Sequence, residues 1–170
     1  MGMTPRYKAY AGIGARICPD AVCSRFNKLG KWLEDKGYTL RSGGAEGADL
    51  AFEKEVKNKE IYLPWKGFNN SPSPLFSIPD RAYELAEKYH PRWHSLSPPA
   101  EKFMARNCQQ VLGQNLDSPV EFIACWTPEG KVYGGTGQAL RMALDLGIPI
   151  FNFGKEGADR ELMEFVANQE

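Results

Sequence analysis

The sequence predicts an α/β protein with a mostly parallel sheet of about five strands and helices on both faces. Short apolar runs, typical of buried strands, alternate with segments whose apolar residues recur every three or four positions. Three of the short runs end in glycine-rich turns, and a helical segment follows each of these turns. Such alternation predicts strand–helix–strand units joined by right-handed crossovers.

The expected strands are short, as buried strands in a parallel sheet usually are. The last one contains Pro149 near its start, which suits an edge strand or the first residues of a strand because proline donates no ladder hydrogen bond. The expected strands cover residues 9–14, 38–42, 60–63, 122–126 and 148–152.

The first helix is well marked by its periodicity. Val22, Phe26, Leu29 and Leu33 recur at helical spacing, and Gly37 ends the pattern. Further helical patterns cover residues 50–56, 79–89, 100–112, 139–146 and 159–167. Residues 65–74 are too rich in Pro, Asn, Ser and Gly for regular structure, so we expect a long surface loop there.

Length and charge limit the classes of function. A chain of 170 residues is typical of one domain, which we expect to span residues 1–170. Lys+Arg and Asp+Glu number 21 each, so no net field favours general binding of nucleic acid. Residues 1–8 lack a signal-peptide core and no long apolar run occurs, which predicts a cytoplasmic protein without a membrane partner.

The cysteines and histidines predict neither a metal nor another cofactor. The four cysteines include no Cys-x-x-Cys pair, and only two histidines are present to complete a metal site. We expect reduced, mostly buried thiols.

The turn at residues 134–138 is the strongest functional signal. Its glycines lack Cβ atoms and permit positive φ, so backbone N–H groups are left accessible at the start of a helix. The helix dipole there favours an anion. We predict a phosphate cradle made by Gly134, Gly135, Thr136, Gly137 and Gln138. A charge at a helix N-terminus contributes about 0.3–2 kcal/mol and micromolar binding needs about 8 kcal/mol, so other loops must contribute.

The turn after the first strand supplies a second group of candidates. Gly12 and Gly14 lie at the end of the strand, and Arg16 follows directly. A guanidinium in this place is suited to a bidentate contact with phosphate or carboxylate, the alternative being a solvated surface arginine.

The turn after the second strand supplies the third group. Ser42, Gly43 and Gly44 are predicted to contact the ligand. Asp49 stands in or beside the first turn of the next helix, where it either caps that helix or binds a ribose hydroxyl. Glu46 lies inside the turn and is predicted to bind ligand or to take part in catalysis. Because the three turns follow parallel strands, they should converge on one site beyond the carboxyl ends of the sheet.

Aromatic residues near these turns are candidates for stacking on a base. Trp65 and Phe68 lie in the long loop, and Trp126 ends the fourth expected strand. The alternative is that these rings close the edge of the domain.

Together, residues 12–16, 41–49 and 134–140 resemble the SLOG superfamily, which joins the DprA/Smf, LOG and YpsA-like proteins. With residues 63–68 and 125–128, the similarity extends over nearly the whole chain and is greatest to short DprA-like proteins encoded by bacteriophages and some bacteria. The resemblance implies a Rossmann-like sheet, a pocket for a nucleotide-derived ligand and a tendency to form dimers or larger homo-oligomers.

The LOG enzymes carry a Pro-Gly-Gly-x-Gly-Thr-x-Glu-Glu motif with a catalytic glutamate. Here Gln138 replaces the threonine, and Leu140 and Arg141 stand where the glutamates would be. Arg106 is the counterpart of an arginine on the preceding LOG helix. Hydrolysis of an N-glycosidic bond would therefore need another acid, for which Glu46 and Asp49 are the candidates.

Three functions follow, in order of preference. The first is binding of a phosphorylated nucleoside or an ADP-ribose-like molecule by a sensing or sequestering module, which in a phage protein would capture a host signalling nucleotide. The second is LOG-like hydrolysis of nucleoside 5′-monophosphates, with Glu46, Asp49 and Arg106 as catalytic candidates. The third is DprA-like binding of single-stranded DNA with stacking on Trp65, Phe68 and Trp93, which the missing basic surplus disfavours.

Overall fold

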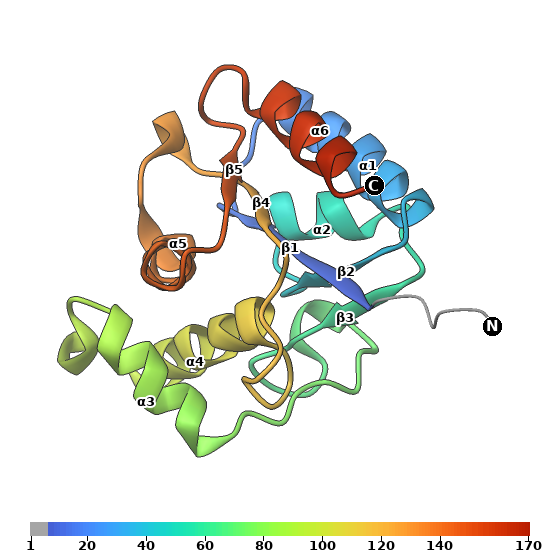
Figure 1. The fold of residues 1–170 in the computed structure, drawn as a ribbon. Coiled ribbons are helices and arrows are strands. Elements are labelled where there is room, and N and C mark those ends of the chain that lie inside the picture. The colour runs from blue at the N-terminus through green and yellow to red at the C-terminus, as the bar shows by residue number, and fades with distance from the viewer. Residues whose placement is uncertain (1–6) are drawn as a thin grey trace.

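The sheet has the predicted parallel α/β architecture. In the computed structural model, which describes residues 7–170, five parallel strands are ordered β3-β2-β1-β4-β5 (Figure 1). The strands are β1 Lys8–Gly14, β2 Tyr38–Ser42, β3 Lys59–Ile61, β4 Ile123–Trp126 and β5 Ile150–Asn152. The order changes direction between β1 and β4, so the carboxyl ends of these two strands flank the place where Rossmann-like folds bind ligands.

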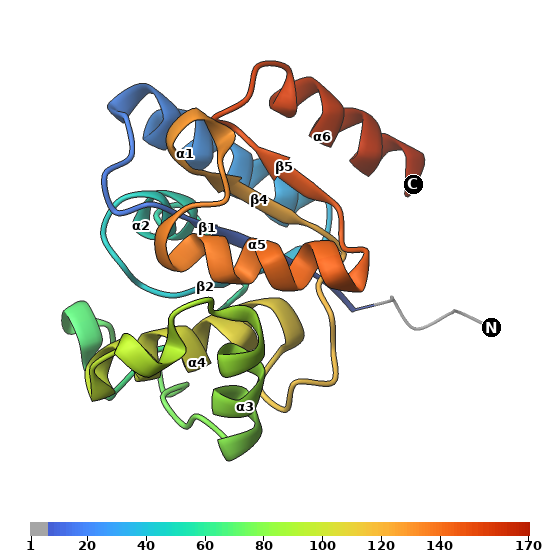
Figure 2. The same ribbon diagram turned by 90° about the vertical axis from the view of Figure 1, so that its left-hand side faces the viewer.

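Helices cover both faces of the sheet, as predicted. The helices are α1 Asp20–Asp35, α2 Ala48–Glu53, α3 Asp80–Tyr89, α4 Pro98–Leu112, α5 Gly134–Leu146 and α6 Ala158–Asn168. One core lies between the sheet and α3, α4 and α5, and the other lies between the sheet and α1, α2 and α6. Figure 2 faces α5, with α3 and α4 beside it.

Strand β1 contributes to both cores through its alternating side chains. Ala9, Ala11 and Ile13 face the α4 and α5 side, and the small volumes of the two alanines let these helices approach the sheet closely. Tyr10 faces the other side and stacks on Phe122 with ring centroids 5.4 Å apart. On the α4 and α5 face, Ile13 also lines the cavity described below.

Some boundaries differ from the sequence-based expectations. Strand β3 ends at Ile61, and Tyr62 forms only an isolated bridge to Leu75 because the chain turns into the long loop there. Helix α2 ends at Glu53, and Leu50 on it is 42% exposed. Pro149 precedes the edge strand β5, and its carbonyl accepts a hydrogen bond from the Ile123 N–H, as its predicted position allows.

The findings on membrane spans, metal sites and cysteines apply to residues 7–170. None of their helices is long and apolar enough to span a membrane. In this part of the chain, no three His, Cys, Asp or Glu side chains gather as a metal site would require. All four cysteines are free; Cys108 and Cys125 are buried, and Cys18 and Cys23 are partly buried.

A buried arginine connects β2, β3 and the loop before β4. Arg41 is 2% exposed and donates to Glu60 Oε1 at 3.2 Å and to the Ser118 carbonyl at 2.5 Å. Tyr62 and Tyr7 also donate to the Glu60 carboxylate. Burial alone would raise the pKa of Glu60, but the hydrogen bonds from both tyrosines and the charge of Arg41 outweigh burial and lower it.

The variant Glu60→Gln should therefore be less stable than the wild type at pH 7, by about 1–3 kcal/mol in the free energy of unfolding. Because the folded pKa is depressed, this stabilisation is present above the unfolded pKa of about 4.3 and is lost as the pH falls through the folded value. Denaturant unfolding should show a smaller difference in the free energy of unfolding between variant and wild type at pH 3 than at pH 7. Glu55→Gln, at an exposed position, is the matched control, and an equal effect of both variants would contradict the prediction.

Candidate functional site

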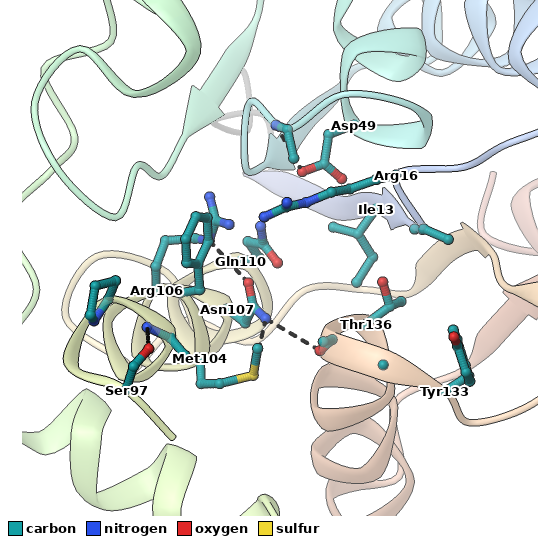
Figure 3. A pocket seen from close by; sticks show the side chains of 18 residues that line it. Ile13, Arg16, Asp49, Ser97, Met104, Arg106, Asn107, Gln110, Tyr133 and Thr136 are labelled. Carbon is teal, nitrogen blue, oxygen red and sulfur yellow. Dashed lines mark hydrogen bonds between the residues drawn. The ribbon is translucent and has the colours of Figure 1, made fainter. Parts of the chain in front are cut away.

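A cavity of about 530 Å³ opens beyond the carboxyl ends of β1 and β4. Its wall is made by the turn after β1, the turn after β2 with the start of α2, one side of α4 from Pro99 to Gln110, and the first turn of α5 (Figure 3). All three predicted glycine-rich turns thus contribute to one cavity at the switch in strand order. Its volume lies within the range of about 300–1,000 Å³ typical of small-molecule sites.

The first turn of α5 presents unpaired backbone donors to this cavity. The first hydrogen bond of the helix runs from the Gly137 N–H to the Tyr133 carbonyl at 2.8 Å, so the N–H groups before Gly137 have no intrahelical acceptor. Among residues 7–170 no side chain caps this end, and its first turn contains no acidic residue. Asn107 fixes the turn against α4 by donating to the Gly135 carbonyl at 3.3 Å. This end of α5 therefore retains the positive potential that attracts an anion.

Arg16 contributes an exposed cation to the same cavity. Its side chain is exposed, and its guanidinium carbon lies 5.3 Å from the centroid of the Phe103 ring. Within residues 7–170 its guanidinium makes no hydrogen bond or ion pair. Glycine at position 47 lets the two turns approach closely, because a Cβ on Gly47 would lie 2.6 Å from the Ala15 carbonyl oxygen. The charge of Arg16 is thus available to a ligand.

Arg106 is a second, rigidly held cation. It is 4% exposed and donates from Nη1 to the carbonyls of Gly43 at 2.6 Å and Tyr62 at 2.8 Å, and from Nε to Asn107 Oδ1 at 3.0 Å. Its Nη2 has no acceptor among residues 7–170. Burial lowers the Arg106 pKa to about 10, with Asp49 opposing the shift and Arg16 adding to it, so the group is a cation at neutral pH.

Asp49 is the buried carboxylate of the cavity. It is 4% exposed, and its Oδ2 accepts from the Ala45 N–H at 3.3 Å, which closes the turn after β2. Gly47 is the N-cap residue of α2, so Asp49 stabilises the turn and does not cap the helix. Burial raises the Asp49 pKa to about 6, although the charge of Arg106 and the hydrogen bond from Ala45 counteract the shift.

The predicted site residues divide into two groups. Those that line the cavity are Gly14, Arg16, Asp49, Arg106, Gly134, Gly135 and Thr136. Gly12 and Ser42 lie in the sheet behind it, where the Ser42 hydroxyl donates to the Gly12 carbonyl at 2.6 Å. Gly137 and Gln138 are buried in α5, and Gln138 donates to the Met104 carbonyl at 2.7 Å. Glu46 is exposed and does not line the cavity.

The remaining predicted glycines, Gly43 and Gly44, lie in the turn after β2. Gly44 has a positive φ of 70°, which favours glycine. Neither is part of the cavity wall, but the carbonyl of Gly43 accepts a hydrogen bond from Arg106.

The aromatic candidates also lie in different places. Trp65 and Phe68 pack edge to face with Phe103, with ring centroids 5.2 and 5.3 Å from that of Phe103, and Phe103 lines the cavity. Trp65 is 40% exposed beside the cavity. Trp126 packs into the core on the opposite face of the sheet.

Sequence reasoning missed Phe103, Asn107 and Gln110 as lining residues. A signal for the last two was present, because polar side chains stand at positions 106, 107, 109 and 110 in the second half of α4, where residues 105–112 are all buried.

Comparison with known proteins supports the fold and leaves the family as a prediction. No protein-family model matches the sequence, and no curated protein matches it. A solved structure of DNA processing protein A from Helicobacter pylori, described for its single-stranded DNA binding mode, is similar with a TM-score of 0.57 at 20% identity. The match covers 92% of this chain and 72% of that one. The chain therefore has a DprA-like fold.

The raised pKa of Asp49 predicts a pH-dependent difference in stability. Between the unfolded pKa of about 3.9 and the folded value of about 6, the folded state binds more protons, so stability falls as the pH rises through this window. The asparagine side chain of Asp49→Asn does not titrate. The free energy of unfolding of this variant, taken relative to that of the wild type, should therefore rise from pH 4 to pH 7 by on the order of 2–3 kcal/mol. Denaturant unfolding at both pH values measures it; a constant difference would show that the carboxyl titrates normally.

Proposed function

We propose that this cavity binds a nucleotide, with its phosphate held by Arg16 and the first turn of α5. The observation that carries the proposal is that an unpaired guanidinium and an uncapped helix N-terminus line the same cavity within residues 7–170. A charge-assisted hydrogen bond adds about 1.5–3 kcal/mol to the 0.3–2 kcal/mol of the helix terminus. The two groups together supply an anchor that neither would supply alone.

The rest of the wall suits the sugar and base of a nucleotide. Ile13, Pro99, Phe103 and Met104 form an apolar part of the wall. An apolar wall gains free energy by covering the faces of a ring, at about 25 cal/mol per Å² removed from water. Cavities that bind small molecules commonly combine such walls with a few directed polar groups.

A free nucleotide-derived molecule is the form of ligand that the charge of the chain favours. The formal net charge is zero, so attraction is local to the cavity and does not extend along a polyanion. The protein would then act as a sensing or sequestering module for a phosphorylated nucleoside or an ADP-ribose-like molecule.

Native mass spectrometry of the protein purified without added nucleotide tests this proposal. A retained intact nucleotide would support capture. A retained free base or ribose phosphate would instead indicate hydrolysis. Calorimetric titration with nucleoside monophosphates and ADP-ribose completes the test, and no heat of binding with any of them would overturn the proposal.

Single-stranded DNA is the second candidate ligand, and the structural comparison favours it over a free nucleotide. The similar Helicobacter pylori protein is described for its binding of single-stranded DNA. In this chain the exposed Trp65 lies beside the cavity and offers a surface on which a neighbouring base could stack. Under this alternative the cavity would hold one nucleotide unit of the strand.

Arg16→Ala should weaken binding of nucleoside monophosphates about 10- to 100-fold, because it removes a charge-assisted contact to phosphate. The melting temperature should barely change, since the side chain is exposed and makes no ion pair within the described residues. Arg160→Ala on α6 is the matched control and should bind as the wild type does. Equal affinities of Arg16→Ala and wild type would show that Arg16 does not bind the phosphate.

Salt dependence separates the two ligands. If a DNA strand binds along the surface, its affinity should fall steeply with salt, with a slope of roughly 0.7 per phosphate contacted. Fluorescence anisotropy of a labelled oligonucleotide at several salt concentrations measures this slope. A slope close to that of a single mononucleotide would indicate that only the cavity, and no further backbone contact, takes part.

A further inference from the structure

Gln110 differs from every other polar residue that α4 buries beside it. It is 3% exposed and lines the cavity, yet its carboxamide makes no hydrogen bond within residues 7–170. The preceding residue, Gln109, is 1% exposed and donates to the carbonyls of Ser77 at 3.0 Å and Gln114 at 3.3 Å. The amide atoms of Gln110 are not among the fully buried side-chain atoms that lack a partner, so the amide is open to the cavity. The Gln110 amide therefore lacks a partner that a bound ligand can provide.

Three buried polar groups meet at this place, around Gly43. A Cβ added to Gly43 would clash with Gln110 Nε2 and would lie 2.6 Å from Arg106 Nη1 and 2.8 Å from Asp49 Oδ2. We call Gly43, Asp49, Arg106 and Gln110 the polar floor. Figure 3 shows the three side chains of the polar floor beside the same cavity, with Arg16 reaching over it. Only glycine at position 43 allows the three groups to come this close.

The charges of the cavity separate into two parts. The carboxylate of Asp49 interacts with the guanidinium of Arg106, and this attraction offsets the positive charge of the polar floor. Arg16 has no acidic partner among the described residues, so its positive charge is not compensated. Arg16 is not part of the polar floor. An anionic phosphate is thus favoured at Arg16, and an uncharged hydrogen-bonding group is favoured at the polar floor.

We propose that the polar floor recognises the nucleobase of the bound nucleotide and that Gln110 is the specificity-determining residue. This inference rests on the proposed function. A glutamine carboxamide presents a donor and an acceptor side by side in one plane, which matches the neighbouring acceptor and donor on the edge of a base. Arg106 Nη2, which also lacks an acceptor in residues 7–170, adds a donor for a carbonyl oxygen or a ring nitrogen.

Gln110→Met tests the inference, because methionine keeps the approximate shape of the side chain and removes both hydrogen-bonding groups. The probes are AMP, GMP, CMP, UMP and ribose 5-phosphate, titrated by calorimetry, with short homopolymeric single strands in the same assay. The wild type should prefer one base. Gln110→Met should bind that base about tenfold more weakly, as expected for a lost hydrogen bond, while ribose 5-phosphate should bind unchanged.

The melting temperature separates recognition from a structural role. Gln110→Met should melt at the same temperature as the wild type or higher, because the amide it removes is unpaired. Gln109→Met is the matched control: it removes two hydrogen bonds outside the cavity, so it should melt at a lower temperature and keep the wild-type order of bases. Gln110→Glu, which replaces the donor by an acceptor, should change that order.

The outcomes are distinct. Failure of the wild type to bind any probe would overturn the proposed function and this inference with it. Binding by the wild type with an unchanged base order and affinity in Gln110→Met would overturn this inference alone. An equal loss for ribose 5-phosphate and for the nucleotides would also overturn it, because the polar floor would then bind the sugar phosphate.

Discussion

The buried guanidinium of Arg106 is the interaction on which the cavity depends. It projects from α4 and binds the carbonyls of Gly43 and Tyr62, which follow β2 and β3 respectively. One side chain thereby sets the distance between a helix and the ends of two strands. A buried cation of this kind is tolerated only when its donors are paired and an opposite charge is near, and Asp49 meets the second condition. The Nη2 of Arg106 is the exception, since it has no acceptor among residues 7–170, and Arg106 lines the cavity.

The cavity combines two electrostatic environments within a chain of zero net charge. Arg16 is exposed and unpaired within residues 7–170, so its attraction for an anion is local and screened by salt. Arg106 and Asp49 are buried and compensate each other. Overall charge therefore says little about this site, because a charge balance summed over the chain does not reveal which cations lack a partner.

Much of the fold was predictable because the signals are local. Apolar runs followed by glycine-rich turns located the strands, and parallel strands necessarily bring their carboxyl ends together. In the structure, Gly14, Gly134 and Asp49 line one cavity. The geometry of parallel strands could not predict which glycines lie on the surface and which in the core: Gly12, two residues before Gly14, has Leu40 and Phe52 where a Cβ would stand.

The sequence indicated Arg106 on α4, but it could not predict which of the neighbouring glutamines faces the cavity, because that depends on how the helix is rotated against the sheet. Gln109 and Gln110 are adjacent and chemically identical, and both are buried. Only the packing of α4 directs one amide to Ser77 and leaves the other facing the cavity without a partner among the described residues. Periodicity detects that a helix is buried, but it does not distinguish a paired amide from an unpaired one. That difference separates a structural glutamine from one able to bind a ligand, and it becomes visible only when every hydrogen bond of the helix is assigned.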